Sequence, residues 1–459
     1  MARCTILLVV LSAFLTPVPV VGQTALDADF DRSGRVDFPD FLLFAKAFGS
    51  HQPEYDLDGD GEVEFDDFVV LSRVFGQKAI LAFADPNLER GVRIALWKAE
   101  GPILLSDVAG MKALSATPSD EENRTDVVES LDGIQYLTDL EELYLNDNQI
   151  DDISLLAGLI SLRRLHIASN RICDITSLAQ LDSLTDLDAN NNQIQDIRAL
   201  SNLTCFQKLS MGGNPIEDVS ALAGLTSLRR LYLNYCSVMD ISALSKLDSL
   251  QVLDLSHNQV RDFSALSNLN SLGSLALGRN PVQDIPASGF ASLASLELSR
   301  CSISDISSLS HFASLSKLVI GGNQIRDISP LSSLDSLRYL DLRESQISDL
   351  SPLSGLTLLT TLYLHYNQVQ DISALSGLSN LETLSLDHNR IRDISALSNL
   401  TSLKYLTLDS NEINDISVLV GNGGLSVLTV VSLTDNPLSQ ESLTVHIPAL
   451  RARRVHVSW

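Results

Sequence analysis

A 22-residue repeat fills most of the chain and limits what it can fold into. Its pattern is L-x-x-L-x-L-x-x-N-x-I-x-D-I-S-x-L-x-x-L-x-x. A unit of this length cannot bury its own apolar face, so successive units must stack, and the repeat predicts a solenoid that presents a repeated surface. The ninth position falls at Asn148, Asn170, Asn192, Asn214, Cys236, Asn258, Asn280, Cys301, Asn323, Ser345, Asn367, Asn389, Asn411 and Asn436.

Each unit is expected to contain one strand and one short return. Leu140, Leu143 and Leu145 point inward, and the residues between them point out along the strand. The amide of Asn148 satisfies backbone groups in the turn that follows. Asp152 then caps a short helical or 3-10 segment that closes the unit.

This pattern resembles the leucine-rich repeat, and D-I-S-x-L resembles its internalin-like bacterial subfamily, from Val128 to about Asn436. The resemblance implies an α/β solenoid, a curved horseshoe with parallel strands on its concave face. The spacing departs twice from 22 residues, between Asn280 and Cys301 and between Asn411 and Asn436, and neither departure breaks the solenoid.

The net charge of -25 argues against a nucleic-acid partner, because phosphate backbones need a basic surface. Much of this charge comes from aspartates that recur at the capping position, from Asp152 to Asp415, and from acids between Asp27 and Asp67. The acidity therefore does not predict a basic partner.

Residues 1–22 are predicted to be a signal peptide. Arg3 precedes an apolar run from Ile6 to Leu15, which is too short to span a bilayer, and small residues precede Gln23. The mature protein is expected to be secreted or displayed at the cell surface, with no membrane span.

The cysteines do not predict a disulfide scaffold. Cys236 and Cys301 occupy the asparagine position three repeats apart, on the order of 14 Å, which is beyond bridging distance. Cys173 and Cys205 lie at non-equivalent positions. All four are expected to be small buried residues.

Two acidic loops follow the signal segment at a spacing of 27 residues, and each precedes a helical phrase that ends in Phe-Gly. In loops of this kind, positions 1, 3, 5 and 12 offer side-chain oxygens and position 7 a carbonyl, which suits calcium. The pattern predicts two calcium ions, and the alternative is an acidic linker in solvent. The predicted ligands are Asp29, Asp31, Ser33, Arg35 and Asp40 in the first loop, and Asp56, Asp58, Asp60, Glu62 and Asp67 in the second.

The pair resembles a dockerin, in which two calcium loops are each followed by one helix and position 12 carries Asp. The resemblance implies a cohesin-like partner on a scaffold or cell surface. Loop positions 10 and 11 depart from the family's small hydroxyl residues, because they are Phe38-Pro39 and Phe65-Asp66. The alternative is that the loops only fold a calcium-stabilised module. The first loop has Ser33 at the position where the second loop has Asp60, so the first loop is expected to be the weaker site.

The remaining segments are expected to cap the solenoid. Leu88, Val92 and Leu96 recur every four residues on a helix that can cover its first end. The predicted domains are a signal peptide at 1–22, a dockerin-like module at 23–77, a helical cap at 78–133, the repeats at 134–436 and a C-terminal cap at 437–459.

Outward strand positions carry the candidate ligand surface, because they have no packing role in the core. Seven of the nine tyrosines lie there. Clustered amphipathic aromatics resemble a protein or glycan contact surface, and the alternative is that tyrosine merely suits exposed strands. Glycines such as Gly278, Gly321 and Gly322 predict a smooth stretch in the middle. The predicted ligand-binding residues are Tyr339, Tyr363, His365, Tyr366, His388 and Tyr405, with a second group at Tyr232 and Tyr235.

The sequence does not predict an enzyme. Catalytic motifs with phosphate-binding glycines, zinc-binding histidines or a nucleophilic serine are absent from it. Asp188, Asp254 and Asp341 share a strand position but lie three or more repeats apart, too far for an acid/base pair. Two function classes remain: an exported recognition protein that binds through the solenoid, and a structural component of a surface assembly in which the dockerin-like module makes the specific contact.

Overall fold

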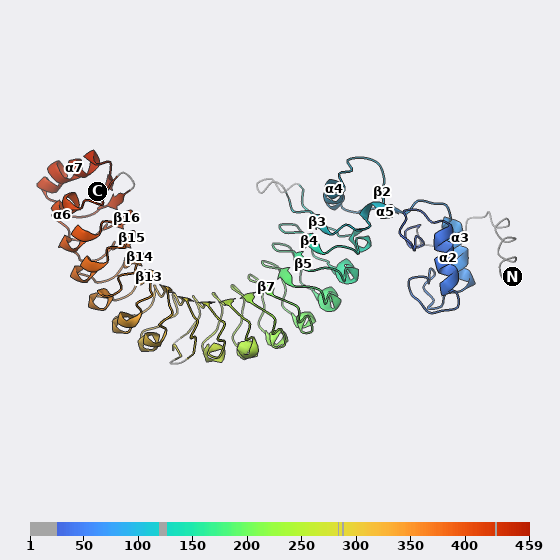
Figure 1. Ribbon diagram of the computed structural model, residues 1–459, viewed down its shortest axis with the longest axis horizontal. Helices are drawn as coiled ribbons and strands as arrows, with labels where there is room; N and C mark the ends of the chain where they lie inside the picture. Colours follow the sequence, from blue (N-terminus) through green and yellow to red (C-terminus); the bar gives the residue numbers. More distant parts are fainter. Residues whose placement is uncertain (1–24, 119–125, 283, 287–288, 427–428) are drawn as a thin grey trace. The chain divides into compact units, whose positions relative to one another are not determined.

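The computed structural model describes residues 25–118, 126–282, 284–286, 289–426 and 429–459 (Figure 1). The chain divides into two compact units, Met1–Leu184 and Thr185–Trp459. The predicted signal segment lies outside the described residues. No helix among the described residues is long and apolar enough to cross a membrane.

The first unit begins with two loop-helix pairs that exchange backbone hydrogen bonds. The helices are α2 (Phe38–Ala47) and α3 (Phe65–Val74). Val36, in the first loop, donates to the Gln77 carbonyl after α3, while Val63, in the second loop, donates to the Ser50 carbonyl after α2. Phe44, Leu71 and their neighbours fill a common core. The equivalent contacts follow from the 27-residue repeat.

The segment from 78 to 133 joins this pair to the repeats. It holds an antiparallel pair, β1 (Ile80–Leu81) with β2 (Ile103–Leu104), then α4 (Pro86–Ala95), α5 (Leu105–Val108) and β3 (Ala113–Ser115). Asp85 caps α4 by accepting from the backbone of Asn87 and Leu88. Strand β3 pairs with the first repeat strand, so the parallel sheet begins inside the region expected to be a helical cap.

The first unit ends in regular repeats. Its parallel strands are β3, β4 (Glu142–Tyr144) and β5 (Arg164–His166). Its 3-10 segments are η1 (Ile134–Tyr136), η2 (Ser154–Gly158) and η3 (Thr176–Gln180).

The second unit has two layers, with strands on one side and returns on the other (Figure 1). Each strand pairs in parallel with the next in sequence. The strands are β6 (Asp186–Asp188), β7 (Lys208–Ser210), β8 (Arg230–Tyr232), β9 (Val252–Asp254), β10 (Ser274–Ala276), β11 (Ser295–Glu297), β12 (Lys317–Val319), β13 (Tyr339–Asp341), β14 (Thr361–Tyr363), β15 (Thr383–Ser385), β16 (Tyr405–Thr407), β17 (Val430–Ser432) and β18 (His456–Ser458).

The returns are short, as the repeat predicted. They are η4 (Arg198–Leu200), η5 (Ser220–Leu222), η6 (Ser242–Lys246), η7 (Ser264–Leu266), η8 (Ser307–His311), η9 (Ser329–Ser333), η10 (Ser351–Leu353), η11 (Ser373–Gly377), η12 (Ser395–Asn399) and α6 (Ser417–Gly421), followed by a C-terminal helix, η13 (Ser442–His446) and α7 (Ile447–Ala452). The capping aspartates act as expected, since Ser154 donates its backbone N–H to Asp152 at 2.7 Å.

In most turns, a buried asparagine at the ninth position forms hydrogen bonds with the backbone of the turn before it. Asn323 accepts from the backbone of Ile303 at 3.0 Å and donates to the carbonyls of Leu298 and Ile320 at 2.9 and 2.7 Å. These bonds satisfy main-chain groups that the strands leave unpaired. The predicted role of the ninth position is confirmed.

The residue immediately before the ninth position adopts a left-handed backbone in every turn, with φ between 50° and 70°. We call this series the left-handed column. Its members are Asp147, Ser169, Asn191, Gly213, Tyr235, His257, Arg279, Arg300, Gly322, Glu344, Tyr366, His388, Ser410 and Asp435.

One expectation about the interior is wrong. Cys173 and Cys205 are exposed, Cys236 is half-buried and only Cys301 of these four is buried. The two exposed thiols lie outside the inward columns of leucine and isoleucine, so packing does not cover them. All four are free thiols.

Candidate functional site

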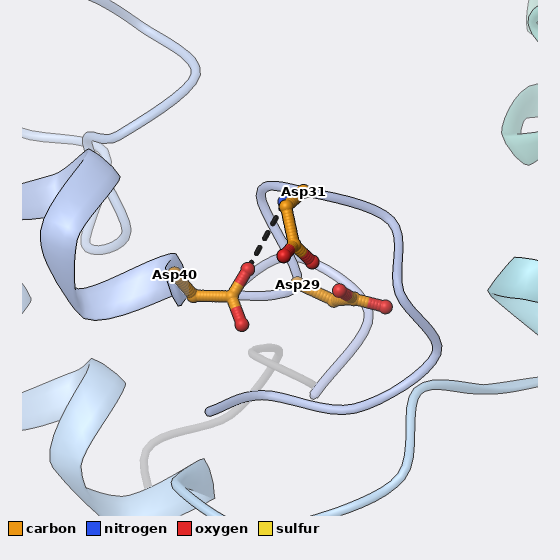
Figure 2. A group of neighbouring side chains, drawn as sticks. All are labelled: Asp29, Asp31 and Asp40. Carbon is orange, nitrogen blue, oxygen red and sulfur yellow. Dashed lines mark hydrogen bonds between the residues drawn. The ribbon is translucent and has the colours of Figure 1, made fainter. Parts of the chain in front are cut away.

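The first acidic loop brings three carboxylates together at the start of α2 (Figure 2). Asp29, Asp31 and Asp40 each place an oxygen within 4.8 Å of the others. Asp40 also accepts from the backbone N–H of Asp31 at 3.0 Å, which fixes the loop against the helix. Ser33 donates its hydroxyl to the Arg35 carbonyl at 3.0 Å, so these two predicted ligand oxygens are neighbours.

The second loop gathers a different trio. Asp56, Asp58 and Asp60 lie within 4.8 Å of one another. Asp67, the predicted ligand at position 12, is not part of this trio. It accepts from the backbone of Leu57 and Glu64 at 2.5 and 2.7 Å, and Asp40 accepts an equivalent backbone bond in the first loop. Glu62 is exposed and holds its place through its backbone N–H, which donates to Asp60 at 2.9 Å.

These loops fit a hard divalent cation. Burial raises the pKa of Asp29 to about 6, and the nearby Asp40 carboxylate adds to the rise. Asp40 is fully buried and its pKa is also raised, first by burial. Like charges held together away from water repel one another, and a calcium ion with oxygen ligands would offset that repulsion. The first loop therefore suits calcium, and the second loop offers three carboxylates of the same kind that are more exposed.

The aromatic residues at loop position 10 are exposed. Phe38 and Phe65 keep 59% and 54% of their surface accessible, although each lies at the first turn of its helix. They occupy equivalent places in the two loop-helix pairs. An exposed aromatic that the core does not use is available for contact with another molecule.

On the solvent-exposed side of the sheet, here called the strand face, five predicted residues form a connected group of rings. Tyr339 contacts Tyr363 at 5.7 Å between centroids, and Tyr366 stacks on His388 at 4.1 Å. His365 links the two pairs, at 6.2 Å from Tyr363 and 5.9 Å from Tyr366.

Two cations flank this group. The Arg343 guanidinium lies 5.7 Å from the centre of the Tyr363 ring, and the Lys317 ammonium lies 5.1 Å from that of Tyr339. Burial, followed by the Arg343 charge, lowers the pKa of His365, which favours its neutral form. The group is amphipathic, with polar atoms among aromatic faces.

The other predicted ligand residues lie apart from this group. Tyr405 is 56% exposed, and no ring contact joins it to the others within the described residues. Tyr232 lines a shallow hollow with Asn190 and Lys208. Tyr235 stacks on His257 at 3.8 Å.

A groove of about 480 Å³ occupies the middle of the strand face, where the sequence predicted a smooth surface. It extends from Asn234 to Glu344. Its charged lining consists of Asp254, Arg279, Glu297, Arg300, Arg343 and Glu344. The prediction of a featureless middle is therefore wrong.

The glycines that suggested smoothness make room for long side chains. A Cβ at Gly278 would lie 2.3 Å from a carboxylate oxygen of Glu297, and one at Gly322 would lie 2.6 Å from Cγ of Arg300. Long side chains from the neighbouring turn cross each glycine. The sequence did contain a signal for this arrangement, because each of these two glycines has a long charged residue in a neighbouring turn.

Comparisons with known proteins match the repeats. A model of two leucine-rich repeats matches residues 138–180, 182–224, 226–268, 248–292, 335–377 and 379–426. No curated protein matches the chain in sequence.

Several solved structures resemble this one. The internalin InlF of Listeria monocytogenes is 35% identical, with a TM-score of 0.67, over 73% of this chain and 96% of that one. InlJ, also of Listeria monocytogenes, is 19% identical, with a TM-score of 0.62 over 76% and 80% of the two chains. The ectodomain of the receptor kinase GASSHO1/SCHENGEN3 of Arabidopsis thaliana, in complex with CASPARIAN STRIP INTEGRITY FACTOR 2, is 25% identical, with a TM-score of 0.61 over 71% and 42%.

The repeated strands and returns, the asparagine bonds between turns and the match along nearly all of InlF agree with one another. The chain belongs to the leucine-rich repeat family, as an internalin-like member.

Proposed function

We propose that this chain is an exported, non-catalytic recognition protein. Its strand face binds a protein partner, and its N-terminal loop pair holds two calcium ions for attachment or assembly. The observation that carries the proposal is the connected group from Tyr339 to His388, which the core does not need and which exposes amphipathic rings beside two cations.

Similar proteins support a binding role. Leucine-rich repeat proteins are typically scaffolds for protein binding. The ectodomain from Arabidopsis thaliana was solved with a bound factor on a fold of this kind. A partner that is a protein fits the mixture of aromatic and charged groups, and a glycan is the alternative that the experiment below separates.

The acidic residues of the strand face support a non-catalytic role, because their carboxylates accept hydrogen bonds from the protein itself. Asp254 accepts from the Ser256 backbone at 2.9 Å. Asp341 is fully buried and accepts from the Arg343 guanidinium at 2.8 Å. A carboxylate held in this way is poorly suited to exchange protons with a substrate.

The loop pair offers a second contact, which favours the alternative function of a structural component in a surface assembly. Phe38 and Phe65 stand exposed at equivalent positions, where a dockerin-like module would meet a cohesin-like partner. In that case the repeats would serve as a spacer, and the loop pair would make the specific contact.

The test is capture of partners from the envelope of the producing cell by the full chain, with bound proteins and glycans identified separately. Replacing Tyr363 and Tyr366 with Ala is expected to lower the captured partner's affinity at least tenfold, because it removes the centre of the ring group. Tyr144→Ala, on a strand of the first unit, serves as the control.

Two results would contradict the proposal. One is unchanged binding by the Tyr363→Ala, Tyr366→Ala variant while the same changes at Tyr232 and Tyr235 abolish it. The other is loss of every partner on changing Phe38 and Phe65 to Ser, which would assign recognition to the loop pair.

A further inference from the structure

The left-handed column changes character along the repeats. Its outer members are Asp147, Ser169, Asn191 and Gly213 at one end and Ser410 and Asp435 at the other, which are small. Between them come Tyr235, His257, Arg279, Arg300, Gly322, Glu344, Tyr366 and His388. Tyrosine, arginine and glutamate are poorly suited to a left-handed backbone, which favours Gly, Asn and Asp.

The fold requires the left-handed backbone but not the large side chains. Arg279 donates its backbone N–H to the Ser299 carbonyl at 2.8 Å, and Ser410 makes the equivalent bond to Thr434 at 2.8 Å. The turn is therefore the same whether the side chain is large or small. Strain that packing does not demand is a signature of function.

The large members form an ordered series. Tyr235 stacks on His257 at one end, and Tyr366 stacks on His388 at the other. Between the two stacks lies the charged groove, where Arg300 reaches over Gly322 to bind both carboxylate oxygens of Glu344 at 2.8 and 2.7 Å. Seven turns separate Tyr235 from His388, about 34 Å at about 4.8 Å per strand.

One charge in this groove is available. Glu297 accepts from the backbone of Gly278 and Ser299 at 2.7 and 3.0 Å. Arg300 and Arg343 are paired with Glu344 and Asp341. Among the described residues, the exposed side chain of Arg279 makes no ion pair or hydrogen bond.

We propose that the large residues of the left-handed column hold an extended acidic peptide segment of a partner protein, with one carboxylate of that segment bound to Arg279. This rests on the proposed function, because it assumes that the strand face binds a partner. A segment of about ten residues at about 3.3 Å each would span both Tyr–His stacks.

The charge pattern favours a peptide over an acidic polysaccharide. The groove carries three arginines and three acids, and the chain as a whole carries a charge of -25. A uniformly anionic polymer would meet repulsion along most of its length. A peptide with a single well-placed acid meets one unpaired guanidinium, and its apolar side chains meet the two stacks.

The experiment selects random twelve-residue peptides displayed on phage against the full chain. The selected peptides are expected to share an Asp or Glu. A synthetic peptide of this set should bind Arg279→Asn at least tenfold more weakly than the native chain. Changing the peptide's acid to its amide should weaken binding to the native chain at least tenfold but leave binding to Arg279→Asn unchanged.

A stability measurement tests the strain. Arg279→Asn should raise Tm by about 2 °C, because Asn accepts a left-handed backbone and Arg279 loses no partner. Ser410→Asn, in the same column beyond the large residues, should raise Tm similarly and leave peptide affinity within twofold.

Four outcomes would overturn the inference: no peptide selected, no acid shared, unchanged affinity in Arg279→Asn, or a fall in its Tm. Binding of polygalacturonate at the groove in place of peptide would also overturn it. The proposed function would survive each of these if the envelope partner still required Tyr363 and Tyr366.

Discussion

The loop pair and the repeats of the second unit bury polar groups of different charge: the repeats bury mainly asparagine amides, and the loops bury carboxylates. In the repeats, the chain itself satisfies each buried asparagine, as Asn323 illustrates with bonds to three neighbouring backbone segments. In the loop pair, the backbone also donates to the buried carboxylates of Asp29 and Asp40, but these charged groups lie close to each other and to Asp31. We propose that the repeats carry their stabilising contacts internally, whereas the loop pair needs a cation to offset the repulsion between its carboxylates.

Removing calcium is expected to have the largest effect and tests this contrast directly. With a chelator, residues 25–77 should lose their amide-exchange protection while residues 185–459 keep theirs. Ligand at a hundredfold excess over Kd stabilises a folded site by about 2.7 kcal/mol, and two such sites account for most of a small module's stability.

Hydrogen-exchange mass spectrometry on the full chain measures both regions at once. Magnesium at the same concentration is the control, because its strict octahedral geometry suits these loops less well. If the amide-exchange protection of residues 25–77 is identical with calcium and with chelator, the loop pair does not depend on calcium and the contrast with the repeats is wrong.

Asn323→Ala should have the next largest effect. It leaves the backbone N–H of Ile303 and the carbonyl of Leu298 buried without a partner, which costs about 3 kcal/mol. The urea midpoint of the repeats should fall, with calcium making no difference. Gln324→Ala, at the exposed neighbouring residue, should leave the midpoint nearly unchanged, and an equal fall in both variants would refute the assigned role.

Acid should destabilise the repeats through their capping aspartates. The backbone N–H of Ser242 donates to Asp240 and lowers the pKa of that carboxyl. In five other turns, the serine two residues after the aspartate lowers the aspartate's pKa in the same way: Asp152, Asp218, Asp305, Asp327 and Asp371. Because the folded pKa lies below the unfolded value of about 3.9, this stabilisation is full above that value and is lost as pH falls through the folded pKa.

The urea midpoint should therefore be flat from pH 7 to pH 5 and fall below about pH 4. Replacing Asp240, Asp305 and Asp371 with Asn, which caps without titrating, should reduce the acid fall and change the neutral midpoint little. An unchanged acid limb in this variant would exclude the caps as its cause.

The repeat predicted the parts of the fold that backbone geometry dictates. Leu140 and Leu143 are buried, Asn148 bonds across turns and Asp152 caps its return, because each position has one physical role in every turn. The repeat also predicted the ring group around Tyr363, since outward strand positions are set by alternation.

The groove escaped prediction because it depends on backbone angle and on contacts between turns. The sequence around Arg279 does not show that its φ is 57°. It also does not show that the Arg300 side chain lies over Gly322, where a Cβ would clash with it. The loop pattern treated Asp67 as equivalent to Asp40, and both carboxylates accept equivalent backbone bonds, yet only Asp40 belongs to the carboxylate trio of its loop.

The most direct test of the account is the affinity of the captured envelope partner for the full chain with calcium and with chelator. The account predicts affinities that agree within twofold, because the residues from Tyr235 to Tyr405 lie in repeats whose bonds need no cation. A tenfold loss with chelator would place recognition in the loop pair and contradict the account.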